Sequence, residues 1–383
     1  MPTYPTYKLG EIAKIYNGNS INAEEKEKKY KGVNGRNYIG TKDIDFDCSV
    51  NYNNGVRIPY GEEKFKIAPA GSVLVCAEGG SAGKKTAFIT EDVCFGNKLF
   101  AITNNQGLFD GKYVFYYTRY KRFFDLFKNE LSGLIGGVSS KKFGEISIPL
   151  PPLPTQQAIV ARIEALFAEL DKAAKHLRTA QQQLKTYRQA VLNHWLNNDE
   201  GKWEMVKLKD CTKKIFAGGD VPKNNFSEIK TEKYRIPIYA NAVKQKGLYG
   251  YTDVSRVNEP CVTIAGRGSG TGHTEIREEP FFPIVRLIVI IPSDNLNNSF
   301  LKYMVDSKTM AITGSAIPQL IVPTVEEYEF SLPPISDQRR IVQEIESRLS
   351  QAEAAEASIA EALQKTEALR QSILKKAFEG NLV

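Results

Sequence analysis

One stretch of the chain occurs twice, and this repeat limits the folds that the chain can adopt. The first copy begins LPPLPTQQAIVARIEALF at Leu150, and the second begins LPPISDQRRIVQEIESRL at Leu332. The two copies align without a gap, and the identical pairs include Gln156 and Gln338, Ile159 and Ile341, Ile163 and Ile345, Arg188 and Arg370, and Leu192 and Leu374. A match that stays in register over this length indicates an internal duplication, so two equivalent halves are expected.

Each copy has the hydrophobic pattern of a long helix. Apolar or small residues recur at alternating intervals of three and four, which is the pattern of a coiled-coil seam. Thr155 and Asp337 are the expected N-caps, no Pro or Gly follows them within either helix, and Gly380 is the expected stop of the second. Two separate amphipathic helices remain the alternative. The predicted seam residues are Ile159, Ile163, Leu166, Leu170, Leu177, Leu184, Ile341, Ile345, Ile359, Leu369 and Ile373.

Two segments without this pattern precede the two helices. They open alike, with Lys8-Leu9 and Lys207-Leu208, and continue with short β-branched runs broken by Gly, Asn and Pro, which indicate strands joined by turns. If the second helix packs on the seam of the first, it must run back toward the first domain, so the pair is antiparallel. We therefore predict an α+β fold in which a long antiparallel two-helix coiled coil separates two similar mixed α/β domains. The predicted parts are residues 1–150 (first domain), 151–198 (first helix), 199–332 (second domain) and 333–383 (second helix).

Composition excludes several classes of protein. The five cysteines are scattered and include no CxxC pair, so we expect no zinc site and a reducing cytoplasm. No apolar run approaches the roughly 20 residues of a membrane span, and the N-terminus has no signal-peptide core. The net charge of +7 permits binding to nucleic acid.

The motifs of common enzymes are absent or incomplete. EGGSAGKK, from Glu78 to Lys85, lacks the first Gly and the final Ser or Thr of a phosphate-binding loop. AGRGSGTGH, from Ala265, has no GxGxxG pattern, and no NPPY or DPPY tetrapeptide of an amino-methyltransferase occurs. Asp220 followed by Glu228 and Lys230 matches a nuclease pattern that arises readily by chance. We expect no catalytic residue and no metal site, and both Gly-rich loops can be simple turns or can approach DNA phosphates closely.

The repeated LPPLPTQQ and LPPISDQ motifs, with the ending SILKKAFEGNLV, resemble the conserved regions of type I restriction-modification specificity subunits. The resemblance covers nearly the whole chain. It implies a non-catalytic subunit whose two target-recognition domains each bind one half of a bipartite double-stranded DNA site, while the helices set the spacer. It also implies that two methyltransferase subunits and restriction subunits are the partners, and that these partners bind S-adenosylmethionine, ATP and magnesium. A scaffold protein with two protein-binding domains is the alternative function.

Candidate DNA contacts are chosen by chemistry, because the recognition domains of this family vary in sequence. Arg, Lys, Asn, Gln, Ser and Thr contact base edges, and Lys and Arg neutralise phosphates. The candidates in the first domain are Arg36, Asn37, Lys42, Lys84, Lys85, Lys98, Ser139, Ser140, Lys141 and Lys142. Those in the second are Asn241, Lys244, Gln245, Lys246, Tyr249, Arg267, Ser269, His273 and Gln319. A solvated surface position is the alternative for each residue, but as a set they concentrate in Gly-rich loops.

Overall fold

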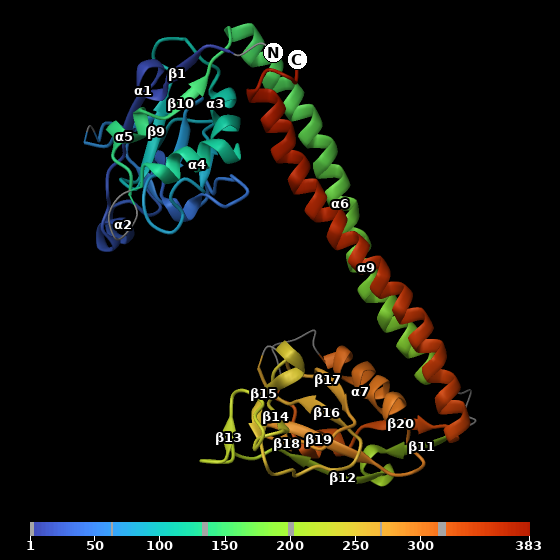
Figure 1. Cartoon of the computed structure of the whole chain (residues 1–383). Helices are drawn as coiled ribbons and strands as arrows, with labels where there is room; N and C mark the ends of the chain where they lie inside the picture. Colours follow the sequence, from blue (N-terminus) through green and yellow to red (C-terminus); the bar gives the residue numbers. More distant parts are fainter. Residues whose placement is uncertain (1–3, 63, 132–136, 198–202, 269, 313–318) are drawn as a thin grey trace. The chain divides into compact units, whose positions relative to one another are not determined.

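The computed structural model of the chain describes residues 4–62, 64–131, 137–197, 203–268, 270–312 and 319–383 (Figure 1). Contacts divide the chain into two units. Unit 1 contains residues 1–177 and 361–383, and unit 2 contains residues 178–360. Each of the two long helices therefore contributes to both units.

Unit 1 is built on two four-stranded sheets. The first is antiparallel, in the order β2 (Lys14–Asn17), β9 (Leu99–Thr103), β6 (Val73–Cys76), β7 (Thr86–Phe88). The second contains the parallel pair β3 and β8, in the order β4 (Arg57–Ile58), β3 (Arg36–Ile39), β8 (Val93–Phe95), β5 (Ile67–Ala68). β1 (Thr6–Lys8) pairs with β10 (Ser147–Pro149). The short helices are α1 (Leu9–Ile12), α2 (Ala23–Lys29), η1 (Thr41–Asp43), α3 (Gly111–Thr118), α4 (Lys121–Asn129) and α5 (Ser140–Gly144).

Unit 2 repeats the antiparallel sheet of unit 1, which confirms the predicted duplication of a mixed α/β domain. Its antiparallel sheet has the order β12 (Thr212–Ala217), β19 (Leu287–Pro292), β16 (Cys261–Ala265), β17 (Thr274–Arg277). The second sheet again contains one parallel pair, β14 and β18, in the order β13 (Phe226–Ser227), β15 (Leu248–Thr252), β14 (Ile236–Tyr239), β18 (Phe282–Pro283). β11 (Glu204–Lys207) pairs with β20 (Glu329–Leu332). The short helices are η2 (Leu208–Cys211), η3 (Lys244–Gly247), α7 (Asn298–Ile312) and α8 (Val322–Glu326).

The central strand β9 is buried on both faces, which explains its unbroken apolar sequence. Because side chains alternate along a strand, Phe100 and Ile102 enter the core that β9 shares with α3, α4 and the long helices. Leu99 and Ala101 enter the opposite core, which β9 shares with β3 and β8. β19 divides its side chains between two cores in the same way. In each unit the antiparallel sheet is therefore covered on one face by helices and on the other by the second sheet.

The two predicted long helices are confirmed as α6 (Leu153–Asn197) and α9 (Ile335–Phe378). The predicted N-caps are wrong, because both helices begin two residues earlier. The backbone N–H groups of Thr155 and Asp337 donate to the carbonyls of Pro152 and Pro334 at 2.9 Å, so these residues lie inside the first turn. Pro154 is tolerated there, since the first four N–H groups of a helix have no intrahelical acceptor.

Helix α9 ends just before a glycine, as predicted. Gly380 has a φ of 78°, in the left-handed region that glycine adopts most readily. The N–H of Asn381 donates to the carbonyl of Lys376 at 2.8 Å, which satisfies one of the unpaired carbonyls of the last turn.

Within each unit, the portions of the two long helices pack in antiparallel fashion. In unit 2, Arg188 pairs with Glu356 at 3.0 Å, and farther along α6 the ring of Trp195 lies 5.1 Å from the Arg348 guanidinium. The later residue of α6 therefore contacts the earlier residue of α9, which is the pattern of antiparallel helices. In unit 1 the early turns of α6 share a core with the last turns of α9, and Arg370 pairs with Asp171.

The predicted seam residues are most buried where the long helices meet the domains. Ile159, Ile163, Ile341 and Ile345 are buried, while Leu166, Leu170, Leu177, Leu184, Ile359 and Ile373 are half-buried.

Leu369 was also predicted in the seam, and that assignment is wrong, because its side chain is 51% exposed. Thr366 and Arg370 face inward instead. The Thr366 hydroxyl donates to Ala362 O at 2.9 Å, and the Arg370 guanidinium lies 4.9 Å from the ring of Phe167. The polar groups of both inward-facing side chains are therefore satisfied.

A buried glutamine anchors the start of each long helix. Gln156 is 0% exposed. Its amide donates to Pro151 O at 2.8 Å and to Leu108 O at 3.2 Å, and it accepts from Asp110 N at 2.9 Å. Asp110 is the N-cap of α3, so this side chain fixes the first turn of α6 to the start of a helix in the preceding domain.

Gln338 makes the same three contacts at the start of α9. Its amide donates to Pro333 O and to Asn295 O, both at 2.8 Å, and accepts from Asn297 N at 2.8 Å. The side-chain oxygen of Asn297 accepts from Phe300 N at 3.0 Å at the start of α7. The duplicated glutamine of the repeat therefore has one structural role in both units.

Candidate nucleic-acid interface

Three segments of unit 2 that are distant in sequence meet where β14 and β16 end. The N–H of Gly266, just after β16, donates to Arg286 O at 3.3 Å, and the Gly266 carbonyl accepts from Leu320 N at 2.9 Å. The Asn241 side chain accepts from Arg267 N at 3.2 Å and donates to the Arg267 carbonyl. We call the described residues of 239–249, 266–273 and 319–320, with Arg286, junction 2.

Unit 1 contains the same backbone arrangement. The N–H of Ala77, just after β6, donates to Lys98 O at 2.8 Å, and the Ala77 carbonyl accepts from Val138 N at 3.1 Å. The Lys85 ammonium donates to Thr41 O at 3.2 Å, which joins the loop after β6 to the segment after β3. We call the described residues of 40–43, 77–85, 98 and 137–142 junction 1.

Most candidates in the second domain lie on junction 2. Lys244, Gln245 and Lys246 are exposed in η3, where Gln245 and Lys246 have left-handed backbones with φ of 50° and 54°. Arg267 and Gln319 are exposed on the other two segments. These residue types can form the phosphate and base-edge contacts of a DNA-binding surface.

The remaining candidates of unit 2 differ in role. The amide of Asn241 is bonded on both sides to Arg267, so it shapes the surface. Tyr249, on β15, is exposed, and its ring centroid lies 5.9 Å from that of Phe226. His273 contacts Glu275 at 3.1 Å. Ser269 lies outside the described residues.

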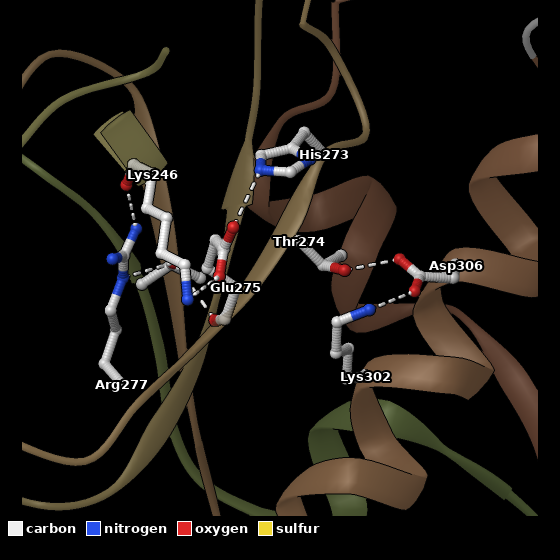
Figure 2. A network of polar contacts seen from close by, with 8 residues as sticks. Lys246, His273, Thr274, Glu275, Arg277, Lys302 and Asp306 are labelled. Atoms are coloured by element: carbon white, nitrogen blue, oxygen red, sulfur yellow. Dashed lines mark hydrogen bonds and ion pairs between the residues drawn. The ribbon is translucent and has the colours of Figure 1, made fainter. Parts of the chain in front are cut away.

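Figure 2 shows the contacts that hold the edge strand β17 at junction 2. Toward η3, the Glu275 carboxylate lies 3.8 Å from the Lys246 ammonium, and Arg277 donates to the Lys246 carbonyl at 2.6 Å. Toward α7, Thr274 donates to Asp306, which also pairs with Lys302 at 2.6 Å. The strand therefore links the surface turn to the helical layer of the domain.

Several candidates in the first domain lie on junction 1. Lys42 and Lys84 are exposed, and Lys84 donates to Gly80 O at 3.2 Å. The Lys98 ammonium pairs with Glu78 at 3.0 Å. The loop after β6 thus presents cations beside its own glycines, where they can reach a phosphate.

The segment before α6 brings four further candidates to the edge of junction 1. Ser139 caps α5, since its hydroxyl accepts from Lys142 N at 3.3 Å. Ser140 and Lys141 line a pocket together with Lys8 and residues of α1. These polar and cationic side chains are exposed.

The structure does not bring Arg36 and Asn37 to junction 1. They lie at the beginning of β3, whereas junction 1 begins after its end at Ile39. The Arg36 guanidinium lies 5.0 Å from the ring centroid of Tyr60, and the Asn37 amide donates to Glu91. Both side chains have partners within the domain, and any DNA contact through them remains a prediction.

The structure adds two cations that the sequence analysis did not select. Arg286 occupies in junction 2 the place of Lys98 in junction 1, and the alignment of RLIVIIP with KLFAIT is the signal that could have identified it. Lys26 of α2 is the other. Burial and then the charge of Lys42 lower the pKa of Lys26. The charged sequence of α2 gave no sign of this.

Two features of the described residues bear on metal binding and on thiol chemistry. No group of three or more His, Cys, Asp or Glu side chains there is placed to hold a metal ion. Burial raises the pKa of Cys261 to about 12 and those of Cys94 and Cys211 to about 11, which suppresses the thiolate that a nucleophile requires. No helix among the described residues could span a membrane.

Comparisons with known proteins agree with the duplicated domain. A family model described as the type I restriction modification DNA specificity domain matches residues 1–178 and 200–364. A putative type I specificity subunit of Mycoplasma pneumoniae is 31% identical over 205 residues, which is 53% of this chain and 55% of that protein. The EcoKI specificity subunit of Escherichia coli K12 is 23% identical over 84% of this chain and 76% of its own. The chain thus spans a little over half the length of the Mycoplasma relative.

Two solved structures share the fold. One comes from a study of complex assembly and conformational transition in a type I restriction-modification system, with a TM-score of 0.81, 18% identity and coverage of 100% of this chain and 99% of that chain. The other is the HsdS subunit of Thermoanaerobacter tengcongensis, with a TM-score of 0.60, 20% identity and coverage of 100% and 98%. With one family match in each half of the duplication, the chain belongs to the family of type I restriction-modification DNA specificity domains.

Proposed function

We propose that this chain is the DNA-recognition subunit of a type I restriction-modification enzyme, acting in the cytoplasm. Junction 1 binds one half of a bipartite double-stranded target, and junction 2 binds the other. The duplicated junction is the observation that carries the proposal, because each unit exposes cations and amides around the same backbone arrangement. Several of these side chains differ between the units, so the two half-sites are expected to differ in sequence.

The long helices are proposed to set the spacer and to dock the partners. The buried Gln156 and Gln338 fix each helix start to its domain, and a fixed attachment is what a ruler between two half-sites requires. The outward faces of α6 and α9 carry many charged residues, which are suited to contacts with two methyltransferase subunits. Restriction subunits complete the enzyme.

Catalysis is assigned to the partners. In this proposal the methyltransferase subunits bind S-adenosylmethionine, and the restriction subunits bind ATP and magnesium. The chain itself supplies recognition, which the match of each half to a DNA specificity domain supports.

Selection of DNA from a random library tests the proposal. The complex of the chain with its methyltransferase subunits is expected to enrich a motif of two defined halves separated by a spacer of fixed length. Overall DNA affinity should fall with raised salt more steeply than base preference does, because phosphate contacts release counterions. Nonspecific binding alone by a folded complex would contradict the proposal and favour a scaffold protein.

A further inference from the structure

The turn η3 of junction 2 is held in an unfavourable backbone conformation. Gln245 and Lys246 have φ of 50° and 54°, and Gly247 follows with φ of 81°. Non-Gly residues seldom adopt this region, and each such residue is strained. A Cβ at Gly247 would lie 2.6 Å from Ala240 O, so glycine is required at the end of the turn. The side chains of Lys244, Gln245 and Lys246 are nonetheless exposed.

A buried arginine supports this turn from below. Arg277, on the edge strand β17, is 5% exposed. Its guanidinium donates to the Lys246 carbonyl at 2.6 Å (Figure 2). It also donates to the Thr263 hydroxyl at 3.2 Å and lies 3.7 Å from the ring centroid of Tyr239. Burying a cation is costly unless its donors are used. Here one donor is directed at the carbonyl of a strained surface residue.

The strand that carries Arg277 is itself fixed on both faces. On the face of Arg277, Glu275 contacts the Lys246 ammonium and His273. On the other face, Thr274 bonds to Asp306 of α7. The position of the turn is therefore defined by the core of the domain as well as by its own backbone. An arrangement that maintains strain to present exposed polar side chains indicates a binding element.

We propose that the turn η3, Lys244–Gly247, is a specificity-determining element for the second half-site and that Arg277 is its positioning residue. This inference rests on the proposed function. Lys244 and Gln245 contact the DNA, whereas Arg277 acts through the backbone of Lys246. Losing the support of Arg277 should therefore alter recognition at the same base positions as losing the Gln245 side chain.

The test uses the full chain in complex with its methyltransferase subunits, and the readout is the methylated motif. Gln245→Ala removes an exposed side chain without disturbing the core. Arg277→Met retains apolar volume but removes the donors, and Arg277→Lys retains charge but cannot reproduce the planar guanidinium contacts. Arg256→Met is the matched control, since Arg256 also stacks on an aromatic ring of unit 2, at 5.2 Å from the centroid of Phe216.

Gln245→Ala and Arg277→Met are expected to reduce discrimination about tenfold at the same one or two positions of the second half-site. The first half-site should be unchanged, Arg277→Lys should give a partial effect, and the double variant should be no worse than the stronger single variant, because both changes act on one element. Arg256→Met should retain the wild-type motif. A merely structural role for Arg277 would instead lower methylation without changing base preference.

An unchanged second half-site in Gln245→Ala overturns the inference even if Arg277→Met fails to fold. The same conclusion follows if Arg277→Met is folded and retains wild-type preference. Failure of the proposed function looks different, because the wild-type complex would then show no bipartite motif, and the inference would fall with it.

Discussion

Replacing Gln338 by Leu should destabilise unit 2 without changing its surface. Gln338 is 0% exposed, and its amide satisfies two carbonyls and one N–H group. Leu fills similar space but leaves these three groups unpaired. Each buried unsatisfied group costs about 1–3 kcal/mol, and the apolar side chain recovers part of the loss, so we expect the free energy of unfolding to fall by about 3 kcal/mol. For a unit of this size that corresponds to a fall in Tm of about 6–12 °C.

Tryptophan fluorescence measures this effect selectively. Both tryptophans of the chain, Trp195 and Trp203, belong to unit 2 and pack against its core. Gln343→Leu is the matched control, because Gln343 is exposed on the same helix and an exposed change should alter stability by less than about 0.5 kcal/mol. A Gln338→Leu protein that melts with the control would refute the role of the glutamine. Gln156→Leu should instead lower the free energy of unfolding of unit 1, and calorimetry would detect this loss.

The remaining predictions concern DNA binding, the spacer and the cysteines. Lys42→Ala or Lys85→Ala should weaken DNA binding and reduce the slope of the logarithm of the binding constant against the logarithm of salt concentration by about 1. Titrations at several salt concentrations measure this slope. Unchanged slopes would exclude these lysines from phosphate contact. Inserting one heptad into α6 near Arg178 and one into α9 near Ala360 should lengthen the spacer by about three base pairs. The estimate takes a helix rise of about 1.5 Å per residue and a DNA rise of about 3.4 Å per base pair. Altered half-sites at constant spacing would contradict this. Half-buried Cys48 should react with a thiol reagent before Cys76, Cys94, Cys211 and Cys261, which are buried, and equal rates in the native state would contradict the packing.

The repeat was sufficient to predict the broad architecture. Identical residues such as Gln156 and Gln338 fall at equivalent sites, so alignment alone identified two halves and two long helices. The prediction failed at Leu369, because a heptad pattern assumes that apolar residues face the partner helix. Arg370 can instead stack on Phe167 and pair with Asp171, contacts that depend on the other helix and cannot be seen in one segment.

The candidate interface was predictable only in outline. Chemistry and Gly-rich sequence selected Arg267 and Lys85, and backbone contacts show that their loops belong to equivalent junctions. The support from Arg277 was not predictable, because it joins an edge strand to a turn through a single carbonyl. Arg36 was selected by the same chemistry, yet it lies at the other end of its strand. Residue type indicates what a side chain can bind, but tertiary pairing decides where it is presented.

The most direct test of recognition by two units is methylome sequencing of cells that co-express the chain with its methyltransferase subunit. The account predicts a bipartite adenine-methylated motif that appears only when the chain is present. Exchanging the unit 2 domain should change one half of this motif alone. Absence of any new motif, with the partner folded and bound, would contradict the account.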